Sequence, residues 1–75
     1  MFQSKKRKAL QPVIDTIRND LSNNYKDNAV EGIRKLKEET EAAASAGTLK
    51  PKELQELRLL VDTFEMDVKN FKRTY

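Results

Sequence analysis

The chain has 75 residues, 37% of them hydrophobic and 36% charged, and its 15 basic and 12 acidic residues give a net charge of +3. This length predicts one small domain with a thin core, which a partner or a second copy would help to stabilise. The chain contains no cysteine and no histidine, which excludes disulfides, thiolate metal sites and catalytic triads that use a histidine base.

The N-terminal segment is basic, as in a secretion signal, but Gln11, Pro12 and Asp15 interrupt any apolar run after it. Elsewhere no stretch approaches the roughly 20 apolar residues that cross a membrane. We therefore expect a soluble cytoplasmic protein that has no membrane partner.

The first predicted helix covers about residues 8–22, because Pro12 is tolerated in a first helical turn and disrupts later ones. Its apolar residues recur every three or four positions and form one face. That face comprises Leu10, Val13, Ile14, Ile17 and Leu21. Residues 1–7 then form either a basic arm or a frayed helical start.

A turn is predicted at about 22–24, where asparagine and serine side chains compete with helical hydrogen bonding. Asn24 is the expected N-cap of a second helix over about residues 25–46, with Asp27 completing a box-like cap. One continuous helix through this segment is the alternative. The predicted core face of the second helix comprises Ala29, Ile33, Leu36, Thr40 and Ala43.

Gly47 is expected to end the second helix in a left-handed conformation, and Pro51 suits the first position of a third helix over about residues 51–73. Leu49 and Leu54 are placed to form a hydrophobic staple. The third helix carries the longest apolar stripe of the chain: Leu54, Leu57, Val61, Phe64, Val68 and Phe71.

Three amphipathic helices with short connections predict an all-α fold, a small antiparallel three-helix bundle that forms a single domain over residues 1–75. A long helical hairpin that dimerises is the alternative architecture. Either arrangement covers the apolar stripes.

The basic run Lys5, Lys6, Arg7 and Lys8 is the first candidate site. Four cations at a helix start oppose the helix dipole, so contact with nucleic-acid phosphates is one explanation for them. The other explanation is solvation or pairing with Glu38, Glu39 and Glu41, because the end of the second helix should lie beside the start of the first.

A second candidate lies on the outer side of the third helix, where Leu59 and Met66 are seven residues apart. Together with Thr63 and the neighbouring Asp62 they form a small apolar spot that suits contact with another protein. Isolated apolar surface residues are also common without any function.

Residues 20–31 have part of the spacing of a calcium-binding loop, but Tyr25 occupies the position that requires glycine. We therefore expect no metal and no cofactor, and without a histidine base we expect no enzyme. The sequence favours a small protein-binding regulator, inhibitor or adaptor, with a nucleic-acid-associated protein as the alternative and a homodimer as a further option.

Overall fold

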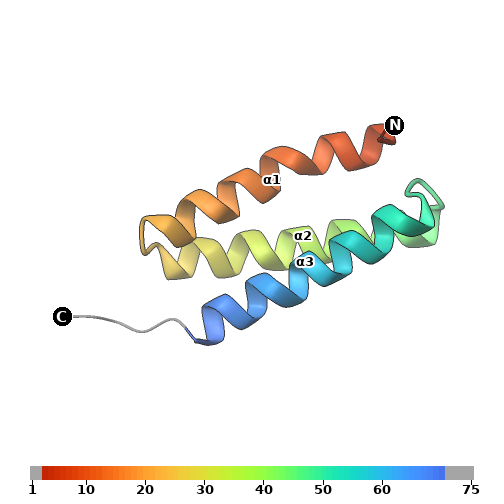
Figure 1. The fold of residues 1–75 in the computed structure, drawn as a ribbon. Helices are drawn as coiled ribbons and strands as arrows, with labels where there is room; N and C mark the ends of the chain where they lie inside the picture. Colours follow the sequence, from red (N-terminus) through yellow and green to blue (C-terminus); the bar gives the residue numbers. More distant parts are fainter. Residues whose placement is uncertain (1–2, 71–75) are drawn as a thin grey trace.

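The computed structural model describes residues 3–70, which form three α-helices (Figure 1). They are α1 (Lys5–Ser22), α2 (Lys26–Ala46) and α3 (Pro51–Lys69). Helix α2 lies between the other two and packs against both (Figure 1). The chain runs up, down and up again, so α1 and α3 begin at the same end. The predicted all-α three-helix bundle is confirmed.

The core is a single cluster to which all three helices contribute. The fully buried face of α2 is the predicted one, and Val13, Leu21, Leu49, Leu60 and Val68 pack at the edges of the cluster. The recurrence of apolar residues every three or four positions therefore predicted correctly which side of each helix faces the core. The buried members of the cluster are Leu10, Ile14, Ile17, Ile33, Leu36, Leu57, Val61 and Phe64. Phe71, the last residue of the predicted stripe, lies outside the described residues.

Helix α1 begins at Lys5, three residues earlier than predicted. Ser4 is its N-cap, and the Ser4 hydroxyl accepts a hydrogen bond of 3.2 Å from the backbone N–H of Arg7. Pro12 therefore lies inside the helix and not in its first turn, which corrects the prediction. Burial of Arg7 and Leu10 stabilises the turns before Pro12 and offsets the backbone hydrogen bond that proline cannot donate.

The turn between α1 and α2 was predicted at the right place, but its cap was assigned to the wrong residue. Asn24 has a φ of 62°, in the left-handed region, whereas an N-cap residue has extended backbone. Tyr25 is the N-cap, and its N–H donates a 2.8 Å hydrogen bond to the carbonyl of Asp20. This turn also excludes the continuous helix.

The turn between α2 and α3 agrees with the prediction. Gly47 ends α2 with a φ of 71°, and Pro51 opens α3. The N–H of Thr48 donates to the carbonyl of Ala43 at 3.0 Å, which satisfies one of the last carbonyls of α2. In the described part of the chain α3 ends at Lys69, and residues 71–73 of the predicted helix lie outside that part.

Among residues 3–70, none of the three helices has the length and apolar character that crossing a membrane requires. The most buried parts of the chain instead face one another within the bundle.

Thr40 is the one polar side chain in the core of the described chain whose buried hydroxyl has no hydrogen-bond partner there. The residue is only 1% exposed. Thr40→Val is expected to raise the free energy of unfolding by about 1 kcal/mol, because it removes a desolvated hydroxyl and keeps the shape of the side chain. Urea denaturation followed by circular dichroism measures this change.

Thr40→Ser is the matched control, since it keeps the hydroxyl and removes a buried methyl group. It should lower the free energy of unfolding by about 1 kcal/mol. A loss of stability in Thr40→Val would show instead that the hydroxyl is satisfied in solution.

Candidate functional site

The basic run at the start of α1 is divided between ion-paired and exposed cations. Lys6 contacts Glu39 of α2, with 2.6 Å between Nζ and Oε1. Arg7 is only 7% exposed, and its Nη2 and Nε lie 3.0 and 3.2 Å from Oε1 of Glu56 on α3. Lys5 and Lys8 are exposed. Two of the four cations therefore contribute to holding the bundle together.

The acidic partners of this run were predicted only in part. Glu39 does pair with the run, whereas Glu38 lies 3.8 Å from Arg34 and Glu41 lies 2.8 Å from Arg58. Glu56 was missed. The predicted topology contained the necessary signal, because parallel first and third helices bring the acidic first turns of the third helix beside the start of the first.

Glu53 links the starts of α1 and α3. Its carboxylate accepts hydrogen bonds from the backbone N–H of Lys50 at 3.0 Å, and from the N–H and hydroxyl of Ser4 at 2.9 and 2.8 Å. The backbone hydrogen bonds from Lys50 and Ser4 lower the pKa of Glu53 below its ordinary value. The carboxylate thus caps one helix and fastens it to the other.

Acid is expected to weaken this link. The pKa of Glu53 is lower in the folded than in the unfolded protein. The Glu53 carboxylate therefore stabilises the folded state fully above about pH 4.5, and this stabilisation is lost as the pH falls through the pKa of Glu53 in the folded state. The loss of unfolding free energy between about pH 6 and about pH 3 should therefore be smaller in Glu53→Gln than in the unaltered chain. Urea denaturation at both pH values measures it, and equal losses would contradict this role.

The residues of the second candidate, on the outer side of α3, are all exposed. Leu59 is 69% and Met66 is 60% exposed, and the hydroxyl of Thr63 donates a 3.0 Å hydrogen bond to the carbonyl of Leu59. Asp62 is exposed and lines a shallow cavity between α2 and α3. Leu59 and Met66 therefore project from the bundle, as expected, and binding by them stays a prediction.

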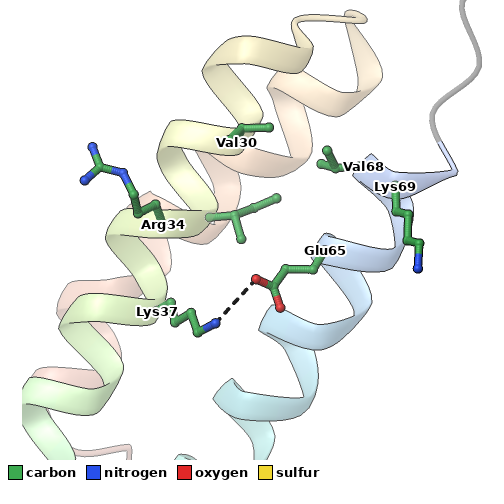
Figure 2. A pocket seen from close by; sticks show the side chains of 7 residues that line it. Val30, Arg34, Lys37, Glu65, Val68 and Lys69 are labelled. Carbon is green, nitrogen blue, oxygen red and sulfur yellow. Dashed lines mark ion pairs between the residues drawn. The ribbon is translucent and has the colours of Figure 1, made fainter.

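A groove that the sequence did not predict runs between α2 and α3 (Figure 2). It has a volume of about 440 Å³, and its apolar lining consists of Val30 and Ile33 from α2 and Val68 from α3. Val30 is 42% exposed although it lies on the side of α2 that faces α3. Helix α3 therefore leaves part of this apolar side of α2 uncovered.

Charged side chains surround the apolar part of the groove. Arg34 and Lys37 come from α2, and Glu65 and Lys69 come from α3. The Lys37 amine and the Glu65 carboxylate point toward each other across the groove, 3.6 Å apart (Figure 2). Hydrogen bonding and charge attraction from Glu31 on the outer side of α2 raise the pKa of Arg34, with a smaller contribution from Glu38.

A smaller cavity of about 220 Å³ lies further along the same two helices and shares Lys37 with the groove. Thr40, Glu41, Arg58, Val61 and Asp62 complete its lining. The two hollows follow one seam, from Val30 to Glu41 on α2. We call this combined feature the α2–α3 groove.

The calcium-like spacing over residues 20–31 does not form a loop in the structure. Asp20 is buried in the last turn of α1, and most of the remaining segment belongs to α2. Within residues 3–70, no three histidine, cysteine or acidic side chains gather where they could hold a metal ion.

No protein-family model matches the chain, and neither a curated protein nor a solved structure is significantly similar to it.

Proposed function

We propose that the chain is a small non-enzymatic protein-binding module, a regulator or adaptor, and that the α2–α3 groove is its binding surface. The observation that carries this proposal is the apolar lining of the groove, in which the exposed Val30 and the half-buried Val68 lie beside the buried Ile33. Covering such a surface removes apolar area from water, which is the main favourable term in most protein association.

The shape of the groove supports the same function. A hollow with an apolar floor and a few charged side chains at its edges gives a partner both a place to bury a side chain and groups that fix its orientation. The absence of histidine and cysteine from the whole sequence also favours binding over catalysis.

Leu59 and Met66 form the competing surface for a protein partner. They are more exposed than Val30, but successive residues of an α-helix are about 100° apart. Met66 therefore lies beside the groove that Glu65 and Lys69 line and is not part of its lining. Leu59 and Met66 stand about two helical turns apart and line neither of the two hollows, so they receive less support.

Nucleic-acid binding by the run from Lys5 to Lys8 also receives less support. Lys6 and Arg7 form ion pairs with Glu39 and Glu56, so binding phosphate through them requires breaking contacts within the bundle. A gel shift with duplex DNA and with single-stranded RNA at low salt tests this alternative, and we expect no retardation.

Affinity capture with the full chain tests the proposed function. The unaltered chain and Leu59→Asp/Met66→Asp are expected to retain the same host protein, whereas Val30→Asp is expected to lose it. Val30 is exposed enough that all three proteins should have the same far-ultraviolet circular dichroism. Loss of the partner in Leu59→Asp/Met66→Asp, with retention by Val30→Asp, would assign binding to the outer side of α3 instead.

A further inference from the structure

We infer that the occupant of the α2–α3 groove is an acidic amphipathic α-helix from another protein, an inference that rests on the proposed function above. The main part of the groove, at its Val30 end, supplies an apolar floor and predominantly basic edges, and the partner helix supplies apolar residues along one side with carboxylates that meet this end.

The architecture selects a helix among the usual forms of bound peptide. Residues 3–70 contain no strand, so they offer no sheet edge to which a peptide strand could be added. Proline-rich peptides dock into grooves lined by aromatic rings, and among residues 3–70 no aromatic residue lines this one. A helix laid along the seam of α2 and α3 extends the packing that the bundle already uses.

The length of the groove agrees with this occupant. Val30 and Glu41 are eleven residues apart on α2, about 16 Å at a rise of roughly 1.5 Å per residue. That distance equals about three helical turns. A helix of this length places three or four apolar side chains on one face, at intervals of three and four residues.

The charged side chains that line the groove determine which charge a partner should carry. Among the described residues, the main part of the groove is lined by three cations, Arg34, Lys37 and Lys69, and by one carboxylate, Glu65. The smaller hollow adds the cation Arg58 and the carboxylates of Glu41 and Asp62, so the excess of cations lies at the Val30 end of the groove. Arg34 already contacts Glu31 and Glu38, and Lys37 contacts Glu65.

Lys69 makes no ion pair within the described part of the chain. Lys26 adds another cation on the side of α2 that carries Val30 and Ile33, because it lies four and seven residues before them. Carboxylates on a partner therefore meet attraction here, whereas cations meet repulsion.

Fluorescence anisotropy with three labelled 18-residue peptides tests the inference. The first is an amphipathic helix with leucine on one side and glutamate beside it. The second has lysine at every glutamate position, and the third has the first composition in scrambled order. At low salt we expect the full chain to bind the acidic helix at least tenfold more tightly than either of the others, with the preference shrinking as salt is added.

Two variants locate the binding. Val30→Asp is expected to weaken binding of the acidic helix at least tenfold, because it places a charge on the apolar floor. Lys69→Glu is expected to reduce the preference for the acidic helix over the lysine helix at least threefold. Lys52→Glu, an equal change of charge at an exposed position in the first turn of α3, is the matched control and should have no effect.

Several results would overturn the inference: equal binding of the acidic and basic helices, insensitivity to Val30→Asp, competition for the groove by an oligonucleotide, or concentration-dependent dimerisation that Val30→Asp abolishes. If a chain truncated after Asn70 binds the acidic helix at least tenfold more tightly than the full chain does, the occupant of the groove is residues 71–75 instead. If affinity capture depends on Val30 while the peptides show no preference for acid, the proposed function stands and only the nature of its partner is wrong.

Discussion

Leu36→Ala is expected to lower the free energy of unfolding by about 2–5 kcal/mol, the largest effect of any single substitution considered for this chain. Leu36 is fully buried on α2, in a core cluster built from all three helices. Its truncation removes apolar contacts and leaves a cavity that neighbouring helices fill only in part. A single core in a domain of this size supplies only about 3–5 kcal/mol, so the substitution should remove a large part or all of the stability of the folded chain.

Urea denaturation followed by circular dichroism measures the loss, and Leu59→Ala is the matched control. Leu59 loses the same atoms from an exposed position of α3, so its variant should stay within about 0.5 kcal/mol of the unaltered chain. A loss below about 1 kcal/mol in Leu36→Ala would contradict a closed core around α2.

Gly32→Val is expected to lower the free energy of unfolding by about 1–3 kcal/mol, because α1 and α2 approach closely at this glycine. A Cβ atom added to Gly32 lies 2.8 Å from Cγ1 of Ile17, a distance at which the Ile17 side chain or one of the two helices must shift. Ile17 is fully buried, so a shift of its side chain disturbs the core packing around it. Valine improves the helix propensity by only a few tenths of a kcal/mol, too little to offset this strain.

Ala42→Val, at an exposed position of the same helix, is the control and should cost about 0.5 kcal/mol or less. Combining Gly32→Val with Ile17→Ala should give a double variant that is more stable than the sum of the two losses, by at least about 0.5 kcal/mol. Additive losses would show that the two residues do not meet.

The fold was largely predictable because it depends on local signals. The stripe containing Leu57, Val61 and Phe64 fixed the buried side of α3, and Gly47 with Pro51 fixed the turn before it. Predictions failed where tertiary contacts override local preference. Pro12 predicts a start of α1 near residue 8, but burial of Arg7 extends the helix back to Lys5.

The candidate site was less predictable than the fold. Periodicity indicates which side of α2 is apolar, but how far α3 covers that side depends on the relative placement of the two helices. Val30 follows Ala29 of the predicted core face in the sequence, and no property of the sequence indicates that it remains 42% exposed beside α3. Sequence reasoning instead favoured Leu59 and Met66, which stand out because they lie opposite a long apolar stripe.

The most direct test of the binding surface is an amide chemical-shift map of the isotopically labelled full chain, titrated with the partner recovered by affinity capture. The proposed function predicts that the perturbed amides concentrate at residues 30–37 of α2 and at Glu65, Val68 and Lys69 of α3. Perturbations centred on Leu59 and Met66, or on the run from Lys5 to Lys8, with the residues of the α2–α3 groove unchanged, would contradict it.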